Sequence, residues 1–157
     1  MNLSNATYLT SEGQARLKKE LEELKTTGRL ELSARLRSAI QMGDLSENAD
    51  YIKAKEDQGF LEGRIIDLEN TLRNAIIIDN IKKDTSIVSI GDTITLELDG
   101  DEAETYYLVG PKEADPINYR ISYESPIGKA VLGFRPGDIV EAETPTGKIQ
   151  IKIVEIK

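Results

Sequence analysis

The sequence predicts an α+β fold, with a long antiparallel α-helical coiled-coil hairpin followed by an α+β domain that has a small antiparallel sheet. From residue 10 to about residue 75 the chain contains no proline, and its apolar residues recur at helical spacing. All five prolines and several short alternating runs lie beyond residue 76. We therefore expect two domains, the hairpin in residues 1–78 and the second domain in residues 79–157.

The hairpin follows from two apolar stripes. The later stripe alternates spacings of four and three, as in a coiled-coil seam, at Ala54, Gln58, Leu61, Ile65, Leu68, Leu72 and Ala75. The earlier stripe is interrupted near Gly28, where we expect a local irregularity, and includes Leu17, Leu21, Leu24, Leu32, Leu36 and Ala39 or Ile40. Neither stripe is stable alone, so an antiparallel pair with its tip at residues 43–48 is the simplest arrangement. A coiled coil by itself is most often a spacer or a dimer zipper, so the tip has to decide the function.

The second domain is predicted from strand-like runs and turn residues. Pro145 and Gly147 fit a hairpin turn, and a short helix is expected from Pro126 to Leu132 because proline favours the first helical turn. The expected strands are residues 93–98, 105–109, 117–123, 138–143 and 148–156. Residues 77–86 read as a linker between the two domains.

Composition excludes several kinds of chemistry. The chain has no cysteine and no histidine, which removes thiolate nucleophiles, zinc–thiolate sites and the commonest general base. Its formal net charge of −8 argues against a protein that binds nucleic acid unaided. The N-terminus lacks a signal-peptide pattern and no run of about 20 apolar residues follows, so a cytoplasmic protein without a membrane partner is expected.

Two carboxylates at the expected tip allow two interpretations. Asp44 and Glu47 are three residues apart, as in a capping box that would satisfy the first N–H groups of the second helix, and Ser46 is a competing N-cap. Alternatively, both could bind a hard cation such as Mg²⁺, which prefers oxygen ligands. Two ligands make a weak site, so this chain would complete a metal site in another protein, such as a two-metal phosphoryl-transfer centre.

Basic residues near the tip also have two readings. Arg35 and Arg37 precede it, and Lys53 and Lys55 follow it. They could contact RNA phosphates, with Arg37, Lys53 and Lys55 as the candidates. Because acids are interleaved with them, a solvated, ion-paired helix face is the alternative.

Several stretches together resemble the bacterial GreA/GreB family of transcription elongation (transcript-cleavage) factors, over essentially the whole chain. The most specific is the GDLSENA motif with the pattern that follows it. The matching segments are YLTSEGQARLKKELEELK (8–25), GDLSENADYIKAKEDQGFLEGRIIDLE (43–69), ISYESPIGKAVLG (121–133) and GDIVEAETPTGK (137–148).

The resemblance implies an accessory factor rather than an enzyme. Its coiled coil would enter the secondary channel of bacterial RNA polymerase, and an FKBP-like C-terminal domain would dock at the channel rim. The factor would stimulate the polymerase's own endonucleolytic cleavage of backtracked nascent RNA, touching the RNA 3′ end indirectly. It would be a monomer with no cofactor of its own and would share Mg²⁺ with the polymerase active site.

The resemblance also implies roles for individual residues. Asp44 and Glu47 match the two tip acids that help bind the second Mg²⁺ and position the attacking water. The same tip motif contains residues expected to support its shape, Gly43, Ser46, Asn48 and Tyr51. The segment expected to dock on the polymerase consists of Ser125, Pro126, Ile127 and Gly128.

Some positions depart from the family pattern. Asp50 stands where glutamate is usual, Ile40 and Gln41 lie where relatives often carry a basic residue, and Phe134 replaces a common lysine. A second hypothesis is a paralogue that occupies the channel and inhibits polymerase. Such a protein is expected to alter the tip acids, and here the pair is intact.

Overall fold

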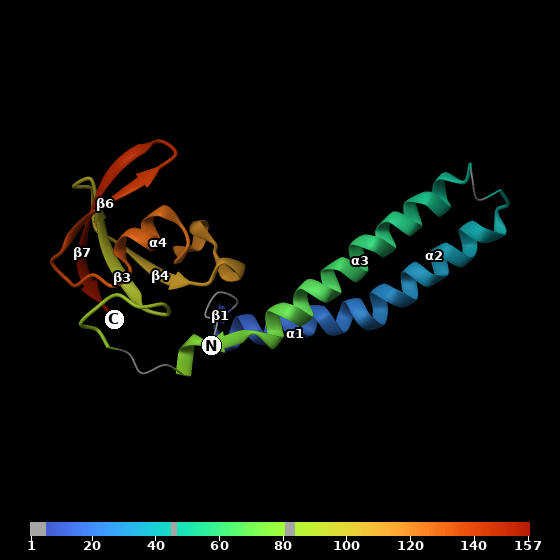
Figure 1. Cartoon of the computed structure of the whole chain (residues 1–157), viewed down its shortest axis with the longest axis horizontal. Coiled ribbons are helices and arrows are strands. Elements are labelled where there is room, and N and C mark those ends of the chain that lie inside the picture. Colours follow the sequence, from blue (N-terminus) through green and yellow to red (C-terminus); the bar gives the residue numbers. More distant parts are fainter. Residues whose placement is uncertain (1–5, 45–46, 81–83) are drawn as a thin grey trace. The chain divides into compact units, whose positions relative to one another are not determined.

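The computed structural model describes residues 6–44, 47–80 and 84–157, which form two compact units (Figure 1). The helical unit is Gln14–Asn74, and the sheet unit is Ala75–Lys157 together with the described residues up to Gly13. The start of the chain thus groups with the sheet unit, whereas the sequence placed all of residues 1–78 in the hairpin. Within the described ranges, no helix has the length and apolar character needed to cross a membrane.

The helical unit is an antiparallel hairpin whose first arm is interrupted. That arm consists of α1 (Ser11–Glu23), a π-helical turn (Leu24–Gly28) and α2 (Arg29–Gln41), and the second arm is α3 (Ala49–Arg73). The irregularity expected near Gly28 is confirmed as this π-turn. A Cβ on Gly28 would lie 3.2 Å from a methyl group of Leu61, so glycine lets the widened turn pack against the other arm.

The two arms share a narrow apolar seam. Ala54, Ile65 and Leu68 of α3 are buried as predicted, and Leu32 and Ala39 of α2 are buried as well. The seam ends earlier than expected, because α3 stops at Arg73 and Ala75 already belongs to a strand.

Ion pairs between the arms flank the seam. Arg29 holds Glu62 with two parallel bonds, Nε to Oε1 at 2.9 Å and Nη2 to Oε2 at 2.8 Å. Further pairs join Lys25 to Glu69, Arg35 to Asp57 and Arg64 to Glu20. The hydrogen bond from Arg29 lowers the pKa of Glu62, and the one from Arg35 lowers the pKa of Asp57.

These shifts predict an acid-sensitive hairpin. A carboxylate with a lowered pKa in the folded state stabilises that state above its ordinary pKa, near 4, and the stabilisation is lost as pH falls through the folded-state value. The melting temperature of the helical signal, followed by far-ultraviolet circular dichroism, should therefore fall between about pH 5 and about pH 3. Arg29→Gln should weaken this dependence and Lys18→Gln, which removes an exposed charge, should not. An equal effect of the two changes would mean that net charge, not pairing, sets the dependence.

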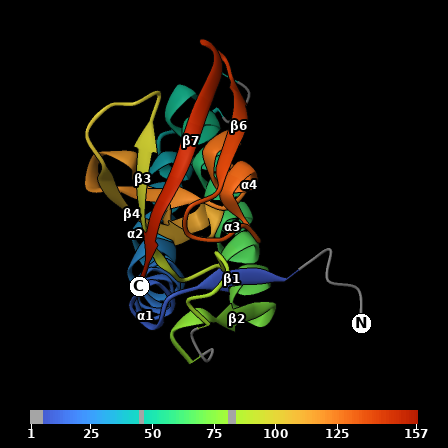
Figure 2. The ribbon, with the colours of Figure 1, turned by 90° about the vertical axis from the view of Figure 1, so that its left-hand side faces the viewer.

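The sheet unit is built around a five-stranded sheet of order β5-β4-β3-β7-β6 (Figure 2). Its strands are β3 (Thr93–Leu98), β4 (Glu104–Val109), β5 (Arg120–Ser122), β6 (Ile139–Thr144) and β7 (Gly147–Ile156). The predicted helix is confirmed as α4 (Pro126–Val131), which packs mainly against β6. Fully buried side chains such as Ile94, Leu108, Val131 and Ile151 form the core.

The sheet departs from the prediction at its β5 edge. Residues 117–123 were expected to form one strand, but Pro116–Asn118 is a 3₁₀ turn and Tyr119 has a left-handed backbone, φ 57°. Only Arg120–Ser122 remains as strand, and it pairs with β4 in parallel. The sheet is therefore mixed rather than wholly antiparallel. The chain reverses at the 3₁₀ turn just before β5, so β5 runs in the same direction as β4.

A short parallel ladder was not predicted. In it β1 (Thr7–Leu9) pairs with β2 (Ala75–Ile77), which brings residues far apart in sequence together. Three-residue strands carry too little alternation to be recognised in a sequence. Of the expected linker 77–86, residues 78–80 form a 3₁₀ turn whose Ile78 is buried, and residues 81–83 lie outside the described part of the chain.

The first turn of α1 is fastened to the sheet unit by a buried carboxylate. Glu113, 4% exposed, accepts hydrogen bonds from the Thr10 amide and the Thr10 hydroxyl, both at 2.6 Å, and from Arg120 Nη2 at 2.9 Å. The Thr10 hydroxyl in turn accepts from the Gly13 amide and so caps the helix. Gly13 has to be glycine because a Cβ there would overlap the Glu113 carboxylate.

Removing this carboxylate should destabilise the sheet unit. Glu113→Ala leaves Thr10 and the largely buried Arg120 without their acceptor, so we expect the free energy of unfolding to fall by about 3 kcal/mol. Chemical denaturation followed by tyrosine fluorescence measures it. Glu141→Ala, which removes an exposed partner of Lys148, should cost less than about 1 kcal/mol and serves as the control. A similar small loss for Glu113→Ala would show that the network is not structurally important.

Candidate functional site

The tip of the hairpin is formed where α2 ends and α3 begins. The first arm is terminated by Met42 and by Gly43, whose φ of 113° lies in a region that side chains rarely adopt. The second helix begins at Ala49, with Asn48 as its N-cap. The predicted tip residue Ser46 lies outside the described residues.

Asn48 holds the two arms together at the tip with the two ends of its side-chain amide. Its Oδ1 accepts a hydrogen bond from the Tyr51 amide at 3.0 Å, which caps α3. Its Nδ2 donates to the Ala39 carbonyl in the last turn of α2 at 2.7 Å. The same side chain therefore satisfies a free N–H of α3 and adds a second donor to the Ala39 carbonyl of α2, which also accepts from the Met42 amide at 3.1 Å.

The capping-box interpretation of Asp44 and Glu47 is wrong. The cap is Asn48, so both acids precede the N-cap of α3 instead of occupying the positions that a capping box requires. Asp44 and Ser46 were considered as N-caps from the sequence and Asn48 was not, although aspartate, serine and asparagine are similar N-caps. The signal that could have distinguished Asn48 is its place directly before the helical run.

The two acids lie at the exposed end of the hairpin. Asp44 and Glu47 are both exposed and border a shallow hollow of about 380 Å³, which Met42, Asn48, Ala49 and Asp50 also line. Carboxylate oxygens are ligands that Mg²⁺ accepts, so the donor chemistry fits such an ion. Within residues 6–44, 47–80 and 84–157, no three acidic residues are grouped closely enough to hold a metal ion.

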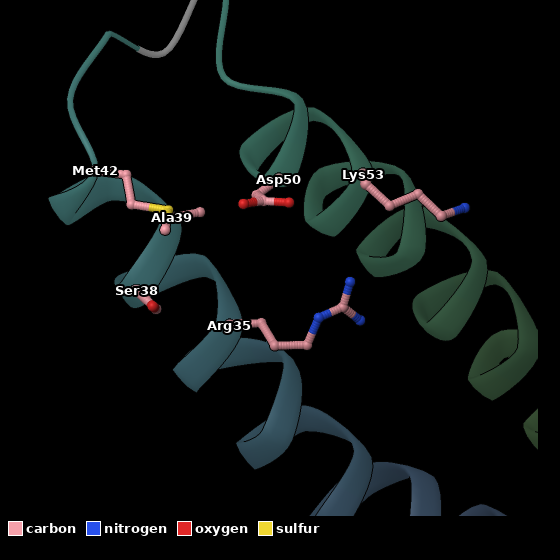
Figure 3. A pocket seen from close by; sticks show the side chains of 6 residues that line it. All are labelled: Arg35, Ser38, Ala39, Met42, Asp50 and Lys53. Atoms are coloured by element: carbon pink, nitrogen blue, oxygen red, sulfur yellow. The ribbon is translucent and has the colours of Figure 1, made fainter.

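A second hollow of about 210 Å³ lies between the arms behind the tip (Figure 3). It is lined by Arg35, Ser38, Ala39, Met42, Asp50 and Lys53. In the close view the Asp50 carboxylate and the Arg35 guanidinium both lie between the two helices.

Arg35 and Lys53, two of the four basic residues near the tip, are paired with acids. Arg35 contacts Asp57 at 3.0 Å, and Lys53 contacts Asp57 at 3.2 Å and Glu56 at 3.4 Å. These bonds raise the pKa of Lys53, chiefly through Asp57. Lys55 bonds the Gln58 side chain, and Arg37 is exposed. Such pairs are the pattern of a solvated helix face, and RNA contact by Arg37, Lys53 and Lys55 stays a prediction.

The expected docking segment forms the start of α4. Ser125 is the N-cap, its hydroxyl accepting from the Gly128 amide at 3.1 Å and donating to the Ser122 carbonyl at 2.7 Å. Gly128 is buried where a Cβ would overlap the Ser122 carbonyl, and Ile127 packs against the core. Pro126 is the exposed member of the segment. Most of this motif thus has a structural reason, and its part in docking stays a prediction.

Comparisons with known proteins agree with the resemblance seen in the sequence. A family model for the N-terminal part of transcription elongation factors matches residues 7–77. A second model, for the C-terminal part of GreA/GreB transcription elongation factors, matches residues 83–157. The chain belongs to the GreA/GreB family.

Full-length relatives in the family are similar throughout. A transcription elongation factor GreA from Acetivibrio thermocellus is 48% identical over 158 residues, covering 100% of this chain and 99% of the relative. One from Bacillus cytotoxicus is 48% identical over 151 residues and covers 95% of each chain.

Solved structures of similar proteins include GreA factor homolog 1 (Gfh1) of Thermus thermophilus. It is 30% identical, with 97% of this chain and 99% of that chain covered and a TM-score of 0.43. A GreA/GreB elongation factor from Nitrosomonas europaea is 26% identical, with 96% and 98% covered and a TM-score of 0.41.

Proposed function

We propose that this chain enters the secondary channel of RNA polymerase with its helical hairpin and stimulates the polymerase's endonucleolytic cleavage of backtracked nascent RNA, rescuing arrested complexes. The observation that carries the proposal is the pair of exposed acids at the tip, Asp44 and Glu47, which precede the Asn48 N-cap of α3. Family membership supports the same role, since the relatives are named transcription elongation factors.

The chemistry would belong to the partner. A second Mg²⁺ shared with the polymerase active site would stabilise charge on the attacking and leaving oxygens. Asp44 and Glu47 would contribute carboxylate oxygens to that ion, and a carboxylate beside it would orient the attacking water. Because this chain offers two such side chains and no histidine or cysteine, it acts as an accessory factor rather than as an enzyme.

Binding to the polymerase would rest on both units. The net charge of −8 disfavours direct nucleic-acid binding, so contact with the RNA 3′ end is indirect and follows from placement in the channel. The sheet unit, of which the Ser125–Gly128 segment is part, would dock at the channel rim. The factor would act as a cytoplasmic monomer, where the polymerase is found.

Removing the tip acids should abolish activity without affecting binding. Asp44→Ala and Glu47→Ala should each reduce transcript cleavage in a purified, backtracked polymerase complex by at least about 100-fold, as expected for loss of a metal ligand. Polymerase affinity and helix content should stay unchanged, because neither residue caps α3.

The matched control is Glu31→Ala, which removes an exposed acid elsewhere on the same hairpin. It should cleave like the wild type. If the wild-type protein binds the polymerase but blocks cleavage, the chain is an inhibitor of the same fold, and the proposed function is wrong.

Docking through the α4 segment can be tested on its exposed proline. Pro126→Glu should weaken polymerase binding by about tenfold or more while leaving the fold intact, since acidic residues are favourable in the first turn of a helix. Pro145→Glu makes the same change at an exposed turn and should bind normally. Competition binding with labelled wild-type protein measures both. Equal affinity of the two variants would place docking elsewhere.

A further inference from the structure

We propose that Asn48 is a positioning residue for the two tip acids, and that its cross-tip bond to Ala39, rather than its capping bond, is the part that cleavage requires. The inference rests on the proposed function, because it concerns the same pair of acids. It assigns separate tasks to the two atoms of one amide: Oδ1 starts α3, and Nδ2 ties α3 to the end of α2.

The cross-tip bond closes the loop that carries the acids. It joins Asn48 to a carbonyl nine residues earlier in the chain, and both Asp44 and Glu47 lie between these two points. Gly43, in the same loop, has a backbone that tolerates many conformations. A fixed distance between the two ends of a short loop restricts the conformations open to it.

Packing alone does not provide this restraint. Ala39 and Ala54 are buried between the arms, whereas Ile40, Met42 and Ile52 around the tip are largely exposed. Beyond the buried alanines the apolar seam therefore no longer holds the arms together. The bond from Asn48 Nδ2 to the Ala39 carbonyl is part-buried and lies where the seam ends, so it sets how the two arms meet.

Asparagine at position 48 differs from the other common N-cap residues, because its amide accepts and donates hydrogen bonds through two separate atoms. Aspartate and serine cap helices about as well as asparagine, and aspartate is additionally favoured by the positive end of the helix dipole. An aspartate carboxylate can accept the Tyr51 N–H but has no proton to donate to the Ala39 carbonyl. If capping were the only task, Asn48→Asp would be neutral or stabilising.

Three variants separate the two tasks. Asn48→Asp keeps a cap for α3, adds a charge and has no proton to donate across the tip. Asn48→Ser keeps a cap without adding a charge, and its hydroxyl, one bond closer to the backbone, does not reach the Ala39 carbonyl while it caps α3. Asn70→Asp adds the same charge to an exposed position of α3 and is the control. Transcript cleavage by a backtracked polymerase complex is measured against Mg²⁺ concentration, together with the factor concentration that half-saturates the polymerase.

For both Asn48 variants we expect the half-saturating Mg²⁺ concentration to rise by about tenfold, which is the lower end of the effect of losing a residue that supports a metal site without binding the metal. The factor concentration needed to half-saturate the polymerase should change less than about twofold, since the substitutions leave the helical hairpin and the proposed docking segment intact. A purely structural role would instead weaken binding or lower the melting temperature and leave the Mg²⁺ dependence unchanged. Wild-type Mg²⁺ dependence in Asn48→Asp would overturn the proposal.

A second readout needs no polymerase. The chain has no cysteine, so Asp44→Cys gives one site for a nitroxide spin label. Adding Asn48→Asp or Asn48→Ser should narrow its electron paramagnetic resonance lines, while a label at Lys18→Cys stays unchanged. Unchanged lines at position 44 refute the positioning role whatever the cleavage assay shows. If the wild type stimulates no cleavage, the proposed function fails and the label alone decides whether Asn48 orders the loop.

Discussion

The pairing of α2 with α3 along a narrow apolar seam is the constraint on which the tip depends. Each arm buries only one stripe, so each needs the other to remain helical in water. Small residues at Ala39 and Ala54 allow close approach near the tip, and charge pairs such as Arg29–Glu62 favour one antiparallel register. Because the register is fixed, the chain reversal falls at residues 43–48, and the acids are placed at the end of the hairpin.

The sheet unit uses a buried polar group where the helical unit uses an apolar seam. Glu113 satisfies the Thr10 amide, the Thr10 hydroxyl and Arg120, so its charge is compensated inside the fold. A buried Glu113 carboxylate without its partners would destabilise the folded state. The network therefore stabilises the fold only when all of its hydrogen bonds are made. It orders the first turn of α1, whose cap is the same threonine.

Sequence reasoning found the elements whose signal is periodic and missed those set by single contacts. The seam through Ile65 and Leu68, the irregularity at Gly28 and the helix after Pro126 follow from spacing and turn chemistry. The β1–β2 ladder pairs Thr7 with Ala75, and the Glu113 network joins Glu113 to Thr10; no local pattern encodes partners so far apart in sequence. The cap at Asn48 was missed for another reason, since aspartate, serine and asparagine are similar N-caps and only Asp44 and Ser46 had been considered.

The N-cap of α3 is Asn48, so the two tip acids have no part in a capping box. Had Asp44 and Glu47 formed a capping box, the start of α3 would account for both acids. With Asn48 as the N-cap, the Tyr51 amide is bonded by another side chain, and both acids are exposed at the tip of the hairpin. Two carboxylates alone bind Mg²⁺ weakly, so under the proposed function a partner would have to supply the remaining ligands. The chemistry proposed for the tip would then be confined to the complex with that partner.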